Sequence, residues 1–296
     1  MLKVAADREV GVLGATSFVG VCLLKLLARD SFKITAFSRK LYDESFYGEY
    51  WEQLPLSLLN GSDRNNIIPM WICVAPIWFL PEYFPLLEKK GVRRIVVLSS
   101  TSIFTKDNSS DLGEQTITRR LANAENAVQV WAAEKGVEWV VLRPTLIYGK
   151  GQDKNISEII RFVRRFGFFP LLGKAEGLRQ PVHCEDVAQL CVSALKTFHI
   201  SNKAYNISGG ETMTYRAMVE RIFISLDMPS RFLLVPLSLF KLALSCLRLL
   251  PKYKHWSSAM AERMNRDLVF DHEDAVRDFG YKPRPFKLLK DDLLIK

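Results

Sequence analysis

The sequence predicts an α/β protein built on a doubly wound parallel sheet, with a smaller C-terminal lobe. Two observations predict the sheet: the chain opens with a strand, a glycine turn and an apolar helix, and short apolar strands then alternate with helical segments. A third observation, the looser pattern after Tyr148 and Gly149, predicts the lobe. We therefore divide the 296 residues into a domain at 1–150 and a lobe at 151–296 that is interleaved with the sheet edge.

The first turn has the composition of a pyrophosphate site. An apolar run at residues 10–13 ends at Gly14, and an apolar helical pattern begins after Ala15, Thr16 and Ser17. A helix N-terminus presents backbone N–H groups and the positive end of the helix dipole to an anion. Ser17 stands where a middle glycine is usual, but it is small and its hydroxyl can donate a hydrogen bond to a phosphate.

Five apolar segments are expected as strands, at residues 9–13, 32–37, 70–74, 94–98 and 138–142, with a helix at 118–135 between the last two. Strands that alternate with helices in this way run parallel and are covered on both faces. In such a sheet the ligand crevice lies at the carboxyl ends of the strands. Residues 38–40, 74–76, 99–102 and 143–145 should therefore converge on one crevice.

The lobe is expected to contain a basic helix at 156–166, a helix at 186–197 and a strand at 204–207. A further apolar helix is expected at 237–250, and at 1.5 Å per residue it would span about 21 Å, too short to cross a bilayer. It either packs on the lobe or lies on an anionic membrane surface, because basic residues flank a wide apolar face. The membrane contact would involve residues 232–256.

Composition and charge narrow the classes of function. The net charge of +9 indicates a basic surface, or attraction to anionic substrates or an anionic membrane. Nucleic acid is not expected as a partner, because no basic and aromatic groove motif or zinc knuckle is present. The N-terminus lacks a signal-peptide pattern, and the five scattered cysteines predict a reducing compartment with no disulfide framework and no metal site.

Five motifs follow one another in the order found in a known family. They are Gly14-x-x-Ser17-x-x-Gly20, Ser99-Ser100-Thr101-Ser102, Arg143-Pro144-Thr145-Leu146-Ile147-Tyr148-Gly149, Arg179-Gln180-Pro181-Val182-His183-x-x-Asp186-Val187-Ala188 and Tyr205-Asn206-Ile207-Ser208-Gly209-Gly210. Over residues 8–225 the chain resembles the extended and atypical short-chain dehydrogenase/reductase superfamily, in its NAD(P)-dependent epimerase/dehydratase branch. The resemblance implies a Rossmann domain that holds NAD or NADP, and a lobe that holds a substrate, often a nucleotide-linked sugar.

The resemblance also implies where the cofactor lies. The expected cofactor contacts are Gly14, Thr16, Ser17, Phe18, Val19, Ser38, Arg39, Lys40, Val74, Ala75, Pro76, Ser99, Arg143 and Pro144. At the end of the second strand an acidic residue would bind the ribose 2′-hydroxyl of NAD, whereas a basic residue accommodates the 2′-phosphate of NADP. Ser38, Arg39 and Lys40 include no acidic residue, so we expect NADP ahead of NAD. Arg179 is expected to contact a substrate phosphate, and Asn155 is a second candidate for the substrate cleft.

The resemblance implies a Tyr-x-x-x-Lys pair on the helix that follows the serine-rich strand end, and this chain lacks it. Counting back from Glu125, the tyrosine position falls at Ile117 and the lysine position at Leu121. In the family the lysine and the nicotinamide ribose lower the pKa of the tyrosine, which exchanges a proton with the sugar hydroxyl.

Three explanations remain open. In the first, Thr101 or Ser100 binds the reacting oxygen and the proton passes through Lys106, Tyr148 or His183, although Tyr148 also fits a packing role and His183 a role in ordering the start of a helix. In the second, the protein binds NADP(H) without turnover, as an accessory or sensor protein. In the third, a residue distant in the sequence fills the role.

We therefore expect an NADP-dependent oxidoreductase or epimerase that acts on a nucleotide-linked or lipid-linked sugar by hydride transfer at a ring carbon. The alternative is a catalytically silent NADP(H)-binding protein. We expect a cytoplasmic protein, either free or peripheral at the inner face of the membrane, that can form a homodimer.

Overall fold

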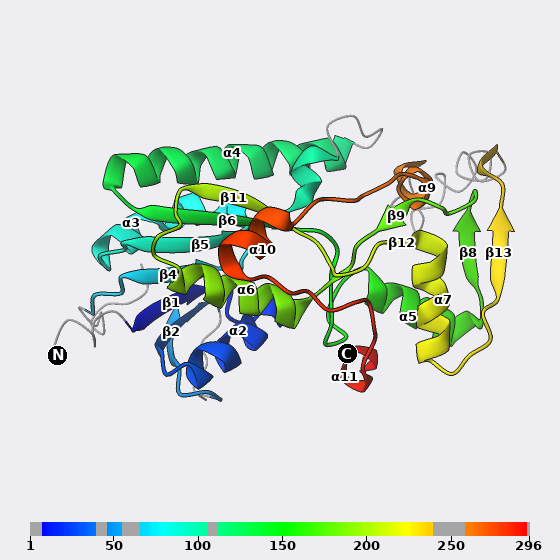
Figure 1. Cartoon of the computed structure of the whole chain (residues 1–296), viewed down its shortest axis with the longest axis horizontal. Coiled ribbons are helices and arrows are strands. Elements are labelled where there is room, and N and C mark those ends of the chain that lie inside the picture. The colour runs from blue at the N-terminus through cyan, green and yellow to red at the C-terminus, as the bar shows by residue number, and fades with distance from the viewer. Residues whose placement is uncertain (1–7, 40–45, 55–65, 106–111, 239–257, 295–296) are drawn as a thin grey trace.

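The computed structural model describes residues 8–39, 46–54, 66–105, 112–238 and 258–294 (Figure 1). The expected apolar helix lies outside these residues from position 239 onward, as do Lys40 and Lys106. Within the described ranges, every helix is too short or too polar to cross a membrane.

The centre of the molecule is a seven-stranded sheet in the order β11-β6-β5-β4-β1-β2-β3, with every pair parallel. The strands are β1 (Glu9–Leu13), β2 (Lys33–Ser38), β3 (Tyr50–Gln53), β4 (Met70–Cys73), β5 (Arg94–Leu98), β6 (Glu138–Pro144) and β11 (Lys203–Ile207). The prediction of a doubly wound parallel sheet is confirmed, and all six expected strands are present within one or two residues. The edge strand β3 was not predicted, because its four residues are largely polar or partly exposed and lack an apolar run.

Helices cover both faces of this sheet (Figure 1). They are α2 (Phe18–Arg29) and α6 (Cys184–Lys196) on one face, and η2 (Ile77–Tyr83), α3 (Phe84–Lys89) and α4 (Leu112–Lys135) on the other. Successive residues of each strand point to opposite faces of the sheet, so each strand contributes to the apolar core on both faces. Val10 and Val12 pack toward α2 and α6. Leu13 and Trp71 pack toward η2 and α4. Gly11 lies under the Trp71 ring, and a Cβ at this glycine would come within 2.5 Å of a ring carbon.

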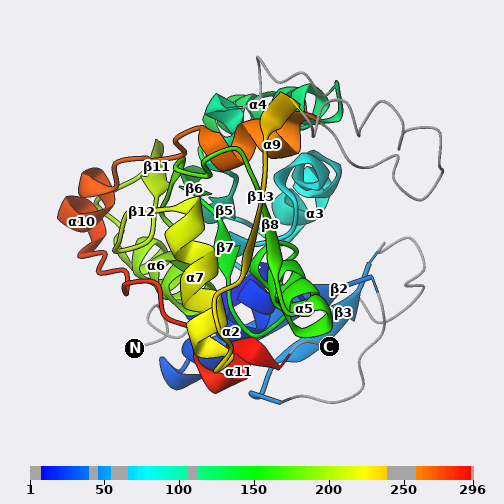
Figure 2. The ribbon, with the colours of Figure 1, turned by 90° about the vertical axis from the view of Figure 1, so that its right-hand side faces the viewer.

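The C-terminal lobe has its own apolar core and lies beyond the carboxyl ends of the strands (Figures 1 and 2). Its helices are α5 (Ile156–Phe166), α7 (Tyr215–Ser225), α9 (Ser258–Asn265) and α11 (Lys290–Leu293), and α10 (Glu273–Phe279) packs against α6 and β11. Its strand pairs are β7 (Ile147–Tyr148) with β10 (Val182–His183), β9 (Leu178–Arg179) with β12 (Met213–Thr214), and β8 (Phe169–Leu172) with β13 (Phe232–Val235). The chain therefore returns from the lobe to the main sheet at α6 and β11.

A buried carboxylate ties the C-terminal segment to the junction of sheet and lobe. Asp292 accepts hydrogen bonds from the backbone N–H groups of Lys150 (2.9 Å) and Leu289 (2.8 Å), and it lies 3.2 Å from His183 Nε2. Burial would raise the pKa of Asp292, but the hydrogen bonds from His183, Leu289 and Lys150 outweigh it and hold the pKa below the ordinary aspartate value. The carboxylate form is therefore the one that the fold stabilises.

We expect Asp292→Asn to destabilise the protein at pH 7 by about 2 kcal/mol, because two backbone N–H groups would lose a charged acceptor. A carboxyl whose pKa is lowered by folding adds stability above its unfolded pKa and loses it as the pH falls through the folded value. Urea unfolding should thus show wild type and variant converging below about pH 4. Asp291→Asn is the control, since the neighbouring Asp291 side chain is 70% exposed. Equal stability of all three proteins at pH 7 would contradict the prediction.

Candidate functional site

The turn between β1 and α2 is closed by its own residues. Ser17 is the N-cap of α2: its Oγ accepts a hydrogen bond from Gly20 N–H (3.0 Å), and its own N–H donates to the Gly14 carbonyl (3.0 Å). Gly14 has a φ of +84°, and a Cβ there would come within 2.4 Å of the Ala75 nitrogen. The turn therefore lies directly against the loop that follows β4, and only glycine permits that approach.

A cleft of about 1190 Å³ runs from this turn along the carboxyl ends of the strands into the lobe. Its sheet end is lined by Ser17, Phe18, Val19, residues 74–78 and residues 98–102. Its lobe end is lined by residues of α5, β8, α7 and α9. Because Phe18 and Val19 occupy the first turn of α2, their N–H groups have no carbonyl partner within the helix. None of the described residues that line the sheet end is charged, so a dinucleotide there would be bound by backbone N–H groups and the helix dipole.

The expected cofactor residues fall into two groups. Those that line the cleft are Ser17, Phe18, Val19, Val74, Ala75, Pro76 and Ser99. Gly14 and Thr16 form the turn itself, and Ser38 and Arg39 lie at the end of β2, where Ser38 is buried and Arg39 is exposed. The described residues of the first group provide a cradle that fits a dinucleotide.

The side chain of Arg143 forms an ion pair beneath the cleft and does not point into it. Its guanidinium forms a bidentate ion pair with the buried Glu125 on α4, at 2.5 and 3.1 Å, and lies over the Phe104 ring. Glu125 also accepts a hydrogen bond from the Ser99 hydroxyl. This network joins α4 to the ends of β5 and β6. Neither Arg143 nor Pro144 lines the cleft, which differs from the expectation that both contact the cofactor.

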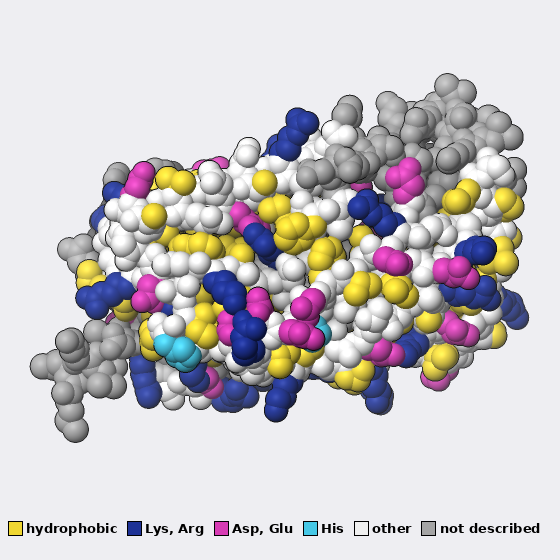
Figure 3. Space-filling view, turned by 45° about the horizontal axis from the view of Figure 1, so that its top comes forward, with side chains coloured by type: hydrophobic (Ala, Val, Ile, Leu, Met, Phe, Trp, Pro, Cys, Tyr) yellow, Lys and Arg dark blue, Asp and Glu magenta, His cyan; other side chains and the backbone are white. Residues whose placement is uncertain are grey.

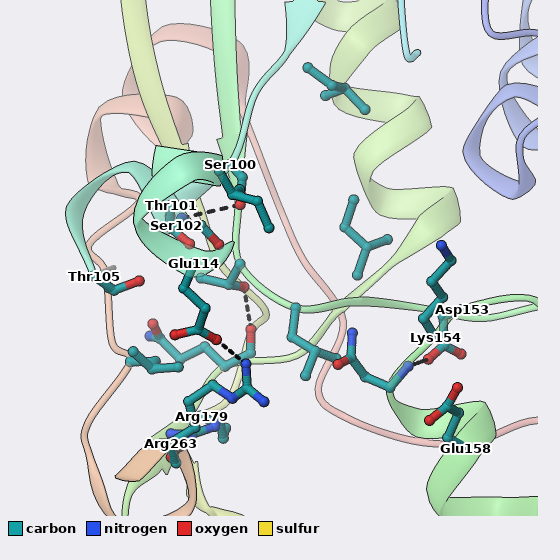
Figure 4. Close-up of a pocket in the computed structure, with 18 of the residues that line it drawn as sticks. Ser100, Thr101, Ser102, Thr105, Glu114, Asp153, Lys154, Glu158, Arg179 and Arg263 are labelled. Carbon is teal, nitrogen blue, oxygen red and sulfur yellow. Dashed lines mark hydrogen bonds and ion pairs between the residues drawn. The ribbon is translucent and has the colours of Figure 1, made fainter. Parts of the chain in front are cut away.

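The two expected catalytic hydroxyls lie on the short helix η3 (Thr101–Phe104) and its N-cap (Figure 4). Thr101 is buried, and its hydroxyl donates to the Pro144 carbonyl at 3.2 Å. Ser100 Oγ accepts from Ser102 N–H at 3.1 Å. All three side chains line the cleft next to its sheet end, so the structure brings together a cluster of hydroxyl groups there.

The tyrosine and lysine positions face the cleft, but both are apolar. Ile117 and Leu121 are four residues apart on α4, on the same face of the helix, and both line the cleft. The count back from Glu125 thus identifies the positions that look into the cleft. At those positions the chain offers no group that can exchange a proton.

Two of the three proposed proton donors are outside the cleft lining. Tyr148 is fully buried and packs edge-on against His183 and Phe286. Burial raises its pKa to about 12. His183 is also buried; it is the N-cap of α6, accepting from Glu185 N–H through Nδ1, and its Nε2 faces Asp292. Both residues therefore have the structural roles that the sequence left open, and Lys106 lies outside the described residues.

A carboxylate that sequence reasoning missed lies one turn before Ile117. Glu114 is largely buried, lines the cleft and forms an ion pair with Arg263 of α9, so the pair spans the cleft from one domain to the other (Figure 4). Its spacing of three residues from Ile117 is the signal that could have found it, because residues three apart share a helix face.

Arg179 lies in the cleft, but its guanidinium is already bonded. It donates to the backbone carbonyls of Leu178 (2.6 Å), Arg266 (2.8 Å) and Arg263, around the C-terminal end of α9. A cation is favourable at this end of a helix. Burial lowers the pKa of Arg179 to about 10. We expected Arg179 to bind a phosphate of the substrate, but in the structure its guanidinium is already bonded to backbone carbonyls.

Asn155 is an exposed residue in the cleft lining and precedes α5 without capping it through its side chain. The cap is supplied by Asp153 instead. One oxygen of this buried carboxylate accepts from the N–H groups of Asn155, Ile156 and Ser157 at 2.9, 2.6 and 3.2 Å, and the other accepts from the Ser157 hydroxyl at 2.9 Å. The N-terminus of α5 therefore already holds an anion from the chain itself.

The NAD dependent epimerase/dehydratase family model matches residues 84–208, which include β5, α4, β6 and β11. The fold is shared with UDP-glucuronic acid 4-epimerase from Bacillus cereus, solved with UDP-glucuronic acid and NAD, at a TM-score of 0.71 with 15% identity over 96% of each chain. Residues 84–208 are therefore similar to the NAD dependent epimerase/dehydratase family, and the whole chain shares the fold of this solved epimerase.

Two curated relatives differ in what their names describe. UDP-glucose 4-epimerase from Vibrio cholerae is 24% identical over 65% of this chain and 59% of its own length. The mitochondrial NADH dehydrogenase [ubiquinone] 1 alpha subcomplex subunit 9 from Dictyostelium discoideum is 25% identical over 71% of this chain and 62% of its own length. The chain thus spans less than two thirds of the length of either relative.

Proposed function

We propose that the protein is an NADP-dependent oxidoreductase or epimerase acting on a sugar linked to a nucleotide or a lipid. The observation that carries this proposal is the continuous cleft, which runs from the turn at Ser17 past the hydroxyl groups of residues 100–102 and the carboxylate of Glu114 into the lobe. The family match and the solved neighbours that contain NAD support a nicotinamide cofactor.

The chain's own residues divide the work in this proposal. When bound, the cofactor supplies the hydride acceptor or donor. Ser102 and Thr101 hold the reacting oxygen through their hydroxyls, and a carboxylate oxygen of Glu114 accepts or returns its proton. Glu114 replaces the absent tyrosine because it lies one turn away on the cleft-facing side of α4. Ile117 and Leu121 exclude water from the space between them.

We expect Glu114→Gln to lower the rate of NADPH oxidation with a responsive keto-sugar by at least about 100-fold, because a positioned proton carrier contributes on that scale. The affinity for NADPH should stay unchanged. Glu134→Gln, an exposed site on the same helix, is the matched control and should react like wild type. Stopped-flow absorbance at the nicotinamide band measures both quantities. A variant that turns over at the wild-type rate would remove Glu114 from this role.

A second candidate function is favoured by a specific observation: Ile117 and Leu121 leave the cleft-facing side of α4 without the usual proton-transfer pair. In this case the protein binds NADP(H) as an accessory or sensor subunit. The Dictyostelium discoideum relative is named as a subunit of an NADH dehydrogenase subcomplex, in line with such a role. Tight NADPH binding with no NADPH oxidation by any of a set of nucleotide-linked and lipid-linked keto-sugars would select this candidate.

We expect NADPH to bind in preference to NADH, with Arg39 reading the 2′-phosphate at the end of β2. Arg39→Asp should reverse the preference, reducing NADPH affinity about 10- to 100-fold by loss of a charge-assisted contact. Arg93→Asp is the control, because this exposed arginine precedes β5, at the amino ends of the strands and so opposite to Arg39, and the charge change is the same. Nicotinamide fluorescence titration measures the affinities of wild type and both variants for NADPH and for NADH. Equal losses in both variants would show a non-specific charge effect.

We also propose that the protein is cytoplasmic, can associate with the inner face of a membrane and can form a homodimer. The membrane proposal is supported by β13, where Leu233 and Leu234 are 53% and 58% exposed just before the apolar segment of the sequence. On the face shown in Figure 3, basic and acidic side chains are interspersed, so charge alone is a weak support there.

A further inference from the structure

At the lobe end of the cleft, the two groups that could bind an anionic part of a substrate are already bonded within the chain. They are the guanidinium of Arg179 and the N-terminus of α5. The guanidinium of Arg179 donates to three backbone carbonyls. The N-terminus of α5 holds the carboxylate of Asp153, which accepts from three consecutive N–H groups. A diphosphate placed there would meet a buried carboxylate of the same charge and would have to compete for groups that are already bonded.

The charged side chains of the described lining balance one another. Four are acidic and four are basic: Glu114, Asp153, Glu158, Glu262, Lys154, Arg179, Arg263 and Arg266. Figure 4 shows Glu114 directed at Arg263, and Asp153, Lys154 and Glu158 grouped on the other side of the pocket. No excess of positive charge therefore faces a ligand that carries two phosphate charges.

Apolar side chains occupy the remaining wall. Partly exposed apolar residues from α4, β7, α5, α7 and the segment after α9 line the cleft; they are Ile117, Ile147, Phe162, Tyr215, Leu268 and Phe270. Together with Leu121 they give an apolar surface that continues from the hydroxyl cluster into the lobe. Apolar surface that a ligand covers is a source of affinity without charge.

We propose that the lobe end of the cleft binds an apolar chain or ring, so that the substrate is a glycolipid-like alcohol or ketone and not a nucleoside diphosphate sugar. This inference rests on the proposed function, of whose two substrate classes it selects the lipid-linked one. The polar head reaches Ser102 and Glu114, and the apolar tail runs along Phe162 and Tyr215.

The test uses the full chain saturated with NADP⁺ and titrated calorimetrically with butyl, hexyl and octyl β-D-glucosides below their micelle concentrations, and with UDP-glucose. Because the head group is constant, affinity should rise by about fourfold for each methylene that the cleft buries. UDP-glucose should neither bind nor displace octyl glucoside. Tight UDP-glucose binding that displaces it would overturn the inference while leaving the proposed function intact.

Two pairs of variants separate the cleft from other apolar surfaces. Ile117→Asn and Phe162→Ala should weaken octyl glucoside binding by about tenfold or more, since each removes apolar contact from the cleft. Val130→Asn on α4 and Phe198→Ala after α6 are the controls, because both residues are about half exposed and lie outside the lining. Equal weakening in cleft and control variants would overturn the inference. A titration of the wild-type protein with NADP⁺ alone distinguishes the failure of this inference from the failure of the proposed function. A wild-type protein that does not bind NADP⁺ would contradict the proposed function itself.

Discussion

Gly14→Ala should reduce NADPH affinity by about 100-fold while the chain still folds. The new methyl would be 2.4 Å from the Ala75 nitrogen and 2.9 Å from the Val74 carbonyl carbon, and backbone atoms cannot rotate away as a side chain can. Relief of the clash requires the loop at 74–76 to move, and that loop lines the sheet end of the cleft. Fluorescence titration with NADPH measures the loss.

Gly136→Ala is the matched control for this substitution. Gly136 has a φ of +67°, close to that of Gly14, but a Cβ there meets nothing within 4 Å. It should cost about 1 kcal/mol of stability through backbone strain alone and leave NADPH affinity unchanged. If both alanine variants bound NADPH as wild type does, the turn at Gly14 would not be the pyrophosphate site.

Arg179→Met should lower the free energy of unfolding by about 3 kcal/mol, because it leaves the carbonyls of Arg263 and Arg266 at the end of α9 without their buried donor, whereas the Leu178 carbonyl keeps the N–H of Leu268. Urea unfolding followed by tryptophan fluorescence measures the loss, and hydrogen exchange should rise first at residues 258–266. Arg161→Met is the control: this arginine is exposed on α5, and its replacement should change stability by less than about 0.5 kcal/mol.

The outcome for Arg179 also decides between two roles. A methionine variant as stable as wild type that failed to bind substrate would make the guanidinium a ligand for the substrate after all. A destabilised variant that keeps NADPH affinity would show that Arg179 holds α9 in place, as its hydrogen bonds indicate.

The sheet could be predicted from the sequence because each strand carries its own signal. Apolar runs such as that of β5 bury both faces of a parallel strand, and the Gly14 turn marks the first crossover. The two-residue strands of the lobe could not be predicted in this way. β9 and β12 pair across more than thirty residues of sequence, and nothing local in Leu178 or Met213 specifies the partner.

The candidate site was predicted where residues lie on strand ends and missed where partners come from distant segments. The hydroxyl cluster at 100–102 followed from its place at a strand end, and the cleft-facing positions Ile117 and Leu121 followed from the family resemblance, counted back from Glu125 along one helix. Glu114 and Arg263 are 149 residues apart, and two of the three carbonyl partners of Arg179 belong to Arg263 of α9 and to Arg266, which follows it. The sequence therefore shows that a residue such as Arg179 could bind a phosphate, but it does not show whether other parts of the chain already occupy its side chain.

The contact between Gly11 and Trp71 restricts how this protein can diverge. The indole fills the space that any side chain at position 11 would need, so the two positions cannot vary independently although sixty residues separate them. A chain with alanine at 11 would require a smaller residue at 71, and the stacking partner Phe37 would then lose its aromatic neighbour. In an alignment of relatives these three positions should change as a set, which makes them a marker for true orthologues among the many proteins that share this sheet.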